Sequence, residues 1–376
     1  MTETTGAEVR KVAIQCVLRI EESQSYANII VPTIISSTSL GIRDRKLVTE
    51  IVYGSTRMKK ALDWAFDRYL PAPPPPALRA SLRVGTYQIL FMRVPDHAAV
   101  NATVSASSKR NKGVVNAVLR KITREGQIHW PNDPTRLSYP DWILELLSDD
   151  LGTEQSVSML EHMNYAPEVS IREDGYHQDR ASQWVIDLMR PEKNDLVLDL
   201  CAAPGGKSTA LARQSSLVIA ADINPSRQTL ISQNLNTLGL KNVFQVISDG
   251  TSPPFPTKSF DKVLVDAPCS GLGVLHRRPD ARWRISKTDV SNLAKLQKQL
   301  LSSASKLVKP GGKLVYSVCT VTRSETIEVA QELQHRHPEL EPIKLTDTRW
   351  RPNGNGLQIL PQDSGTDGMS IFQWTV

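Results

Sequence analysis

The sequence predicts an all-α region followed by a Rossmann-like α/β domain, and three observations lead to this fold class. Across residues 4–125, apolar residues recur at helical spacing, for example Val9, Ala13, Cys16 and Ile20. From residue 195 onward, short apolar runs alternate with helical stretches, which is typical of a parallel sheet covered on both faces. A turn of small residues, 202–206, joins the first of these strands directly to a helix.

The expected elements of the α/β domain follow from this alternation. Strands are expected at 196–200, 217–222, 243–247, 260–266, 312–318 and 370–375. Helices are expected at 207–213, 225–238, 289–308 and 324–336. The run Lys309-Pro310-Gly311-Gly312 is expected to stop a helix just before a strand.

Composition narrows the class of protein. The chain has 376 residues, which is enough for two domains, and 40% hydrophobic and 22% charged residues are ordinary for a globular protein. The sequence contains no run of eighteen apolar residues, so no membrane span is expected. Its polar start lacks the apolar core of a signal peptide. We therefore expect a cytoplasmic protein that is not bound to membranes. The net charge of +6 suits a polyanionic partner.

The four cysteines predict reduced thiols. No Cys-x-x-Cys pair exists, so neither a metal site nor a disulfide framework is expected. Cys16 reads as a small buried hydrophobe, and at Cys201 the backbone is expected to matter more than the thiol. Cys269 and Cys319 instead follow two predicted strands. Ligands of open α/β sheets bind at the carboxyl ends of strands, so these two thiols are expected to face one crevice.

Three cofactors compete for the turn at 202–206. A phosphate-binding P-loop needs glycine where Cys201 stands, and a dinucleotide fingerprint needs more than the adjacent pair Gly205-Gly206. An S-adenosylmethionine (SAM) site fits better, because acids follow the next two strands. Asp222 is placed to accept ribose hydroxyls, and Asp249 is placed where an adenine edge would be read.

Several motifs together resemble the RsmB/Sun family of RNA cytosine-5 methyltransferases. They are Asp199-Leu-Cys-Ala-Ala-Pro-Gly-Gly-Lys207, Asp266-Ala-Pro-Cys-Ser-Gly271, Tyr316-Ser-Val-Cys-Thr320 and the closing Leu360-Pro361…Thr366-Asp367-Gly368, which resembles the last strands of the family. The resemblance implies SAM as cofactor and RNA as partner, with small-subunit (16S) rRNA as the expected substrate. It also implies a cofactor site of Cys201, Ala202, Ala203, Pro204, Gly205, Gly206, Lys207, Asp222, Arg227, Asp249 and Asp266.

The chemistry requires a thiol. Carbon 5 of cytosine is a poor nucleophile, and a thiolate that adds to carbon 6 makes it an enamine-like one. By resemblance, Cys319 is the nucleophile and Cys269 assists release of the methylated base, while Asp266 and Lys207 complete the catalytic set. This chain has Val318 where the family most often has threonine, which removes a hydroxyl next to the nucleophile in sequence.

The helical region resembles the NusB-like RNA-binding domain of the same family. The resemblance rests on Tyr53-Gly54, on 82–88, on Val94-Pro95 and on 115–120. The densest basic stretch of the chain is 109–124, which contains Lys109, Arg110, Lys112, Arg120, Lys121 and Arg124. We expect it to contact RNA phosphates, above all through Lys109, Arg110 and Lys112. A basic loop after Cys269, with Trp283 embedded, is expected to pack the tryptophan and to turn Arg277, Arg278, Arg282 and Arg284 toward RNA.

The middle of the chain departs from the family. Members usually carry a small α/β RNA-recognition subdomain there, of which only 169–175 remains. We expect three parts: a NusB-like domain at 1–128, a linker with short helices at 129–176, and the methyltransferase domain at 177–376. A monomer is expected. A transfer-RNA or large-subunit-RNA methyltransferase and a non-catalytic ribosome-assembly factor stay open as alternatives.

Overall fold

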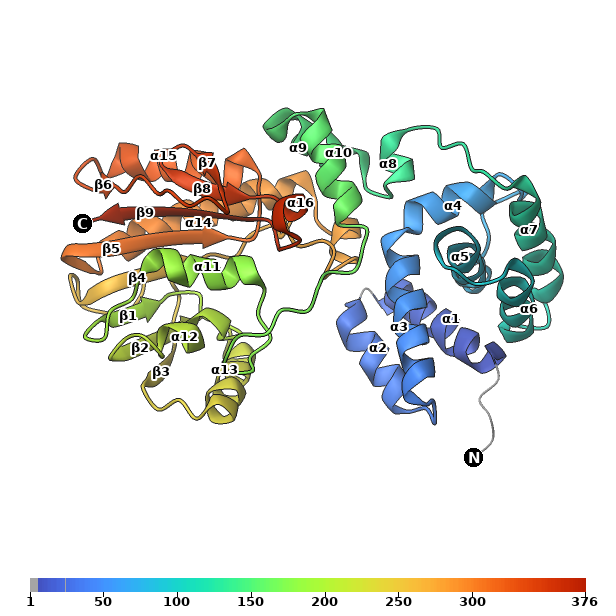
Figure 1. The fold of residues 1–376 in the computed structure, drawn as a ribbon, viewed down its shortest axis with the longest axis horizontal. Coiled ribbons are helices and arrows are strands. Elements are labelled where there is room, and N and C mark those ends of the chain that lie inside the picture. Colours follow the sequence, from blue (N-terminus) through green and yellow to red (C-terminus); the bar gives the residue numbers. More distant parts are fainter. Residues whose placement is uncertain (1–5, 24) are drawn as a thin grey trace. The chain divides into compact units, whose positions relative to one another are not determined.

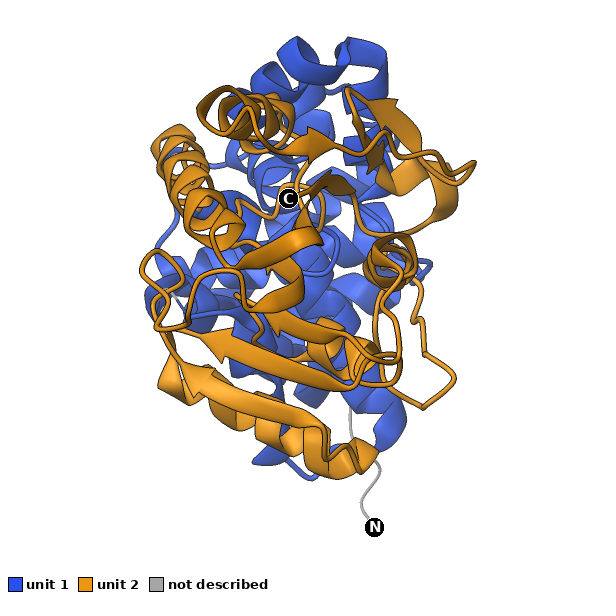
Figure 2. Ribbon diagram, turned by 90° about the vertical axis from the view of Figure 1, so that its left-hand side faces the viewer, with its two compact units in different colours: residues 1–165, 275–284 blue, residues 166–274, 285–376 orange. Residues whose placement is uncertain are grey.

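The protein forms two compact units in the computed structural model, which describes residues 6–23 and 25–376. Unit 1 extends to Tyr165 and also contains Leu275–Arg284. Unit 2 consists of Ala166–Val274 and Ile285–Val376 (Figures 1 and 2).

Unit 1 is helical, as predicted. Its first seven helices are α1 (Gly6–Ser23), α2 (Ala27–Ser36), α3 (Ile42–Arg57), α4 (Lys59–Asp67), α5 (Pro76–Phe91), α6 (Asp96–Ala106) and α7 (Lys112–Glu125). Two of the motif residues explain how α3 and α5 pack. A Cβ added at Gly54 of α3 would lie 1.8 Å from the Tyr87 ring of α5, so only glycine lets this ring approach.

The structure divides the chain differently from the three parts expected. The helices α8 (Asp133–Arg136), α9 (Asp141–Leu151) and α10 (Thr153–His162) belong to unit 1, and the rest of the expected linker, 166–176, belongs to unit 2. The expected linker region is therefore shared between the units. Residues 275–284, expected within the methyltransferase part, belong to unit 1 and include the short 3-10 helix η1 (Ala281–Trp283).

Unit 2 is built on a sheet with strand order β3-β2-β1-β4-β5-β9-β8-β7, and β6 pairs with β9 (Figure 1). The strands are β1 (Leu196–Asp199), β2 (Leu217–Asp222), β3 (Val243–Ile247), β4 (Phe260–Asp266), β5 (Val308–Val318), β6 (Glu341–Pro342), β7 (Arg351–Asn353), β8 (Gly356–Ile359) and β9 (Met369–Thr375). The first five strands run parallel.

Alternate residues of these strands enter two cores, so the prediction of helices on both faces is confirmed. Leu198 packs with α14 (Lys287–Ser305) and α15 (Ile327–Arg336) on one face. Its neighbour Val197 packs with α11 (Arg180–Met189) and α12 (Gly206–Leu211) on the other. The remaining helices are α13 (Pro225–Leu238) and α16 (Pro361–Ser364).

Three details of the sheet correct the sequence prediction. The last strand, β9, pairs antiparallel with β5, so the sheet is mixed. The short strands β6, β7 and β8 were not expected. The run 309–312 lies inside β5, which begins at Val308, because a register shift between Phe260 and Lys262 absorbs the glycines without ending the strand.

Among the described residues, no helix combines the length and the apolar character needed to cross a membrane.

Candidate active site

The site lies where the chain order of the parallel strands reverses. Strand β1 pairs with β2 on one side and with β4 on the other. Open α/β sheets bind ligands outside the carboxyl ends of their strands at such a point. Asp199 ends β1, Asp266 ends β4, and Cys319 directly follows β5. The three motifs identified in the sequence therefore meet at one edge of the sheet.

The small-residue turn after β1 adopts a strained backbone that glycine permits. Gly205 has φ 101°, and α12 begins at the next residue. The turn is held from two sides. The backbone N–H of Ala203 donates to Asp222 Oδ2 at 3.0 Å, and Arg227 Nη2 donates to the Ala203 carbonyl at 2.5 Å. Two predicted cofactor residues thus fix the turn itself.

Asp199 is the most perturbed carboxyl group of the site. The residue is 1% exposed, and this burial raises its pKa to about 7. A 2.6 Å hydrogen bond from Ser208 Oγ lowers the pKa and so opposes part of this shift. Its Oδ1 atom is buried and has no hydrogen-bond partner. An orphaned buried oxygen at the end of β1 is a group that a bound ligand would satisfy.

The ends of β2 and β3 offer the features that a nucleoside requires. Asp222 Oδ1 accepts from the Asn224 N–H at 2.9 Å, which fixes the carboxylate at the strand end. Asp249 accepts two hydrogen bonds from Thr251, which lower its pKa. Beside these acids, Ile223 and Ile247 are 65% and 59% exposed. Ribose hydroxyls suit the acids and an adenine ring suits the isoleucines, so the residues present fit SAM.

The remnant segment before α11 braces the turn, a function that sequence reasoning did not assign. Residues 171 and 177 form a β-bridge. Arg172 Nη1 donates to the Gly206 carbonyl at 2.8 Å, and the guanidinium lies 4.7 Å from the centre of the Tyr176 ring. Asp174 holds Arg172 through a 2.6 Å ion pair and has a pKa of about 2: burial opposes its charge, and hydrogen bonds from Arg172, Tyr176 and Arg213 outweigh that effect.

Lys207 and Asp266 form an ion pair at the C-terminal end of β4. Lys207 Nζ lies 2.8 Å from Asp266 Oδ2, and Ser317 Oγ donates to Asp266 Oδ1 at 2.6 Å. Burial alone would lower the pKa of Lys207, but attraction by Asp266, Cys319 and Asp199 outweighs burial and raises it. Lys207 therefore stays a cation near Cys319.

The two predicted catalytic thiols meet. Cys269 Sγ and Cys319 Sγ are 3.3 Å apart, within hydrogen-bond distance for sulfur. The hydrogen bond to Cys319, together with burial, raises the pKa of Cys269 well above its usual value. Cys201 is partly buried with a raised pKa, mainly through burial, and Cys16 lies in the core of unit 1 with a pKa of about 12 for the same reason.

Val318 is fully buried in the core on one face of the sheet, so the hydroxyl that the family has at this position would not face the crevice. The hydroxyls beside the thiols come instead from Ser317 and Thr320, and Ser270 Oγ contacts Thr320 Oγ1 at 3.0 Å.

Sequence reasoning also missed Glu325, which precedes α15. Its carboxylate is completely buried and accepts hydrogen bonds from Ser270, next to Cys269, and from Thr320, next to Cys319. No spacing in the sequence marks this residue, because it is one of several polar residues in the loop after Cys319.

The candidate RNA contacts of unit 1 differ in exposure. Lys109, Arg110 and Lys112 lie exposed at the turn that joins α6 to α7. Arg278 is exposed and Arg277 is partly exposed. For these five residues, RNA contact stays a prediction.

Arg282 does not face outward, which corrects the prediction that it reaches RNA. It is fully buried within unit 1, where its guanidinium lies 3.8 Å from the centre of the Tyr139 ring. It donates to the Asn164 side chain at 2.9 Å, and burial lowers its pKa to about 10. Arg284 is also engaged, with its guanidinium 4.4 Å from the Tyr26 ring centre.

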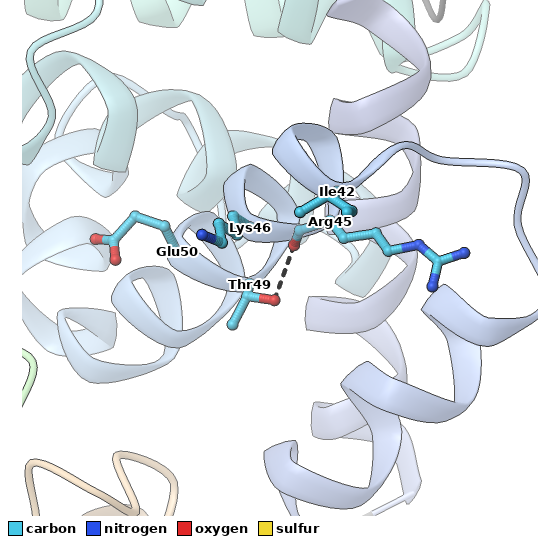
Figure 3. Close-up of a pocket in the computed structure, with 5 residues that line it drawn as sticks. All are labelled: Ile42, Arg45, Lys46, Thr49 and Glu50. Carbon is cyan, nitrogen blue, oxygen red and sulfur yellow. Dashed lines mark hydrogen bonds between the residues drawn. The ribbon is translucent and has the colours of Figure 1, made fainter. Parts of the chain in front are cut away.

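A surface hollow on α3 is a further concave feature of unit 1 (Figure 3). Its walls come from one helix, with Thr49 Oγ1 donating to the Arg45 carbonyl at 2.9 Å, and its other lining residues are Ile42, Lys46 and Glu50. None of the predicted catalytic or cofactor residues lies there.

Each unit matches a known protein family. Residues 186–374 match the family model of the 16S rRNA methyltransferase RsmB/F, and residues 7–124 match the NusB family. A probable ribosomal RNA small subunit methyltransferase B of Bacillus subtilis is 32% identical over 435 residues, covering 96% of this chain and 97% of that protein. The ribosomal RNA small subunit methyltransferase B of Erwinia tasmaniensis is 30% identical, covering 96% of each chain.

Structural comparison agrees on the fold. The crystal structure of PH0851 superposes with a TM-score of 0.80 over 100% of this chain and 99% of that chain, at 22% sequence identity. The alignment to the Bacillus subtilis relative is longer than the 376 residues of this chain, so that relative contains segments that this chain lacks.

The fold and the turn after β1 define a methyltransferase of the Rossmann-like, SAM-dependent class. The chain belongs to the RsmB/F family of 16S rRNA methyltransferases, a family of SAM-dependent RNA cytosine methyltransferases, and carries a NusB domain at its N-terminal end.

Proposed function

We propose that this protein methylates carbon 5 of a cytosine in small-subunit (16S) rRNA through a covalent bond between Cys319 and the base. The observation that carries this proposal is the pair of thiols 3.3 Å apart, beside the Lys207–Asp266 ion pair. A single thiol at a strand end is most often a small hydrophobe, whereas two in contact at a ligand crevice suit covalent catalysis.

Cys319 acts first in this proposal. Its thiolate adds to carbon 6 of the cytosine, and the electron pair of the C5–C6 double bond makes carbon 5 a nucleophile. The Lys207 ammonium attracts the negative charge of the Cys319 sulfur. Asp266, held by Lys207 and Ser317, would hydrogen-bond the nitrogen side of the ring.

Cys269 acts in release. After methylation, carbon 5 carries both the methyl group and a hydrogen. Once Cys319 is bonded to carbon 6, it no longer carries the charge that holds the proton on Cys269, and Cys269 releases that proton to solvent. The Cys269 thiolate then takes the proton from carbon 5, the C5–C6 double bond re-forms, and the C6–S bond breaks with its electron pair returning to Cys319.

SAM supplies the methyl group as an electrophile on its positively charged sulfur. Residues 201–206, with Lys207, would hold it beside the turn, and Asp222 would bind the ribose hydroxyls. Asp249 would meet the adenine side, and Arg227 would keep the turn in shape through the Ala203 carbonyl.

The choice of small-subunit rRNA rests on the relatives, which are named for that substrate and match along 96% of this chain. The exposed cations Lys109, Arg110, Lys112 and Arg278 support a polyanionic partner, because phosphate contacts supply most of the affinity for RNA. An enzyme acting on this substrate works in the cytoplasm.

The covalent step has a direct test. The wild-type protein, Cys319→Ala and Cys269→Ala are each incubated with unmodified 16S rRNA and SAM and run on a reducing, denaturing gel. We expect Cys319→Ala to transfer no methyl group and form no adduct, and Cys269→Ala to accumulate a protein–RNA adduct. Full activity of Cys319→Ala would refute the assignment of the nucleophile.

A further inference from the structure

We propose that Glu325 is a positioning residue that holds Cys269 beside Cys319 for the release step. This inference rests on the proposed function, because it assigns a task to a residue outside the set that touches the reacting atoms.

The carboxylate of Glu325 accepts five hydrogen bonds in a fully buried position. Oε1 accepts from the Ser270 backbone N–H at 2.8 Å and from Gln297 Nε2 at 3.2 Å. Oε2 accepts from the hydroxyls of Ser270, Thr322 and Thr320 at 2.5, 3.0 and 3.2 Å. One side chain therefore ties together the loop after β4, the loop after β5 and α14.

These contacts enclose Cys269 on both sides along the chain. Ser270, which follows Cys269, gives Glu325 its backbone N–H and its hydroxyl. Pro268, which precedes Cys269, accepts from Gln297 Nε2 at 2.9 Å, and the same Gln297 amide also donates to Glu325. Glu325 thus fixes the backbone of Cys269 through both neighbours.

Cys319 depends less on Glu325 for its position. It directly follows β5, which pairs with β4 and with β9, and the Thr320 carbonyl accepts a hydrogen bond from Ser370 of β9 at 3.2 Å. Cys269 instead lies in a loop. Loss of the Glu325 carboxylate should therefore displace Cys269 more than Cys319.

The chemistry of the cluster points to a geometric function rather than to stability. These five donors are neutral backbone, hydroxyl and amide groups. A buried carboxylate is costly to desolvate, and well-packed apolar residues in its place are often as stabilising. Five donors that converge on one side chain do, however, fix the separation of the two loops, and a misplacement of 1 Å at a reacting group costs roughly 100-fold in rate.

The test compares Glu325→Gln and Glu325→Ala with Glu328→Gln, an exposed position three residues further along. Each variant is given unmodified 16S rRNA and SAM, and three quantities are measured: turnover, SAM affinity and the adduct on a reducing, denaturing gel. For Glu325→Ala we expect unchanged SAM affinity, turnover reduced roughly 100-fold, and adduct accumulation like that of Cys269→Ala. Glu325→Gln should be affected less, because its amide oxygen still accepts two of the bonds. Glu328→Gln should match the wild type.

A second pair of variants covers the case in which Glu325→Ala does not fold. Ser270→Ala and Thr322→Val each remove one hydroxyl donor to Oε2, but only Ser270 is next to Cys269. Ser270→Ala should accumulate more adduct than Thr322→Val.

Two outcomes would overturn the inference. Glu325 variants with wild-type turnover and no adduct would show that Cys269 needs no such support. Variants that lose SAM binding, adduct formation and turnover together would show that Glu325 only maintains the fold. If Cys269→Ala itself forms no adduct, the release step in the proposed function fails, and this control shows that failure separately.

Discussion

Asp199 and Asp266 end neighbouring strands, yet their surroundings give them different tasks. Asp266 is paired with Lys207 and accepts from Ser317, so it is suited to an electrostatic function in the crevice. Asp199 has one partner, Ser208, and one buried oxygen without any. Burial outweighs the Ser208 hydrogen bond and the attraction of Lys207 and raises its pKa to about 7, so near neutral pH its folded form holds a proton that an unfolded chain releases.

This difference predicts how stability depends on pH. Asp199 has an ordinary pKa of 3.8 and a folded-state pKa of about 7, so its contribution is complete below pH 4 and is lost as the pH rises to about 7. The loss amounts to roughly 4 kcal/mol at most. We expect Asp199→Asn to remove this dependence, as measured by urea unfolding of the SAM-free protein at pH 5 and pH 8. Equal pH dependence in both proteins would contradict the assignment.

At the scale of elements, the segment before α11 contacts the cofactor turn. Arg172 reaches the Gly206 carbonyl, and the Tyr176 hydroxyl accepts from Asn234 Nδ2 at 3.2 Å. Asn234 in turn donates to the Pro204 carbonyl at 2.9 Å. The segment therefore supports the turn through two routes.

Because Arg172 supports the cofactor turn through the Gly206 carbonyl, we expect its replacement to lower the affinity for SAM. Removing a hydrogen bond from a charged group costs about 1.5–3 kcal/mol, so Arg172→Ala should raise the dissociation constant for SAM roughly 10-fold or more. Arg213→Ala is the matched control, because Arg213 pairs with the same Asp174 but is exposed. Calorimetric titration with SAM measures both, and equal affinities for the two variants would refute the brace.

Local sequence patterns predicted some features of the fold and the candidate site and missed others. The five parallel strands were predicted to within a few residues, because each contains a short apolar run. The antiparallel direction of β9 was missed, since the local pattern of a strand is the same in either direction. Cys269, Cys319, Asp266 and Lys207 could be predicted from motifs, whereas Glu325 and Arg172 act through contacts with residues distant in sequence.

At the scale of the whole molecule, the chain leaves unit 2 at Leu275 and returns to it after Arg284. Within unit 1 this segment supplies Arg282, which donates to the carbonyls of Arg57 and Ser138, and Trp283, which donates to the Thr56 carbonyl at 2.7 Å. A basic sequence around a tryptophan suggested an RNA-facing loop, and only its long-range contacts reveal that Arg282 is structural.

Two arginines of this segment should therefore behave differently when replaced. Arg282→Ala leaves several buried acceptors without a donor and should destabilise unit 1 by about 2–4 kcal/mol, seen as a lower urea midpoint. Arg278→Ala, at an exposed position, should leave stability unchanged, weaken RNA binding and reduce its salt dependence by about one charge. A normal midpoint for Arg282→Ala would contradict its structural function.

The central claim is tested most directly by transfer of labelled methyl from SAM to unmodified RNA. Small-subunit rRNA, large-subunit rRNA and transfer RNA are assayed separately with the wild-type protein, and each product is digested and examined for 5-methylcytosine. We predict 5-methylcytosine in small-subunit rRNA alone. Label only in another RNA would keep the chemistry and refute the substrate, and no label in any RNA despite SAM binding would contradict the account and favour an assembly factor.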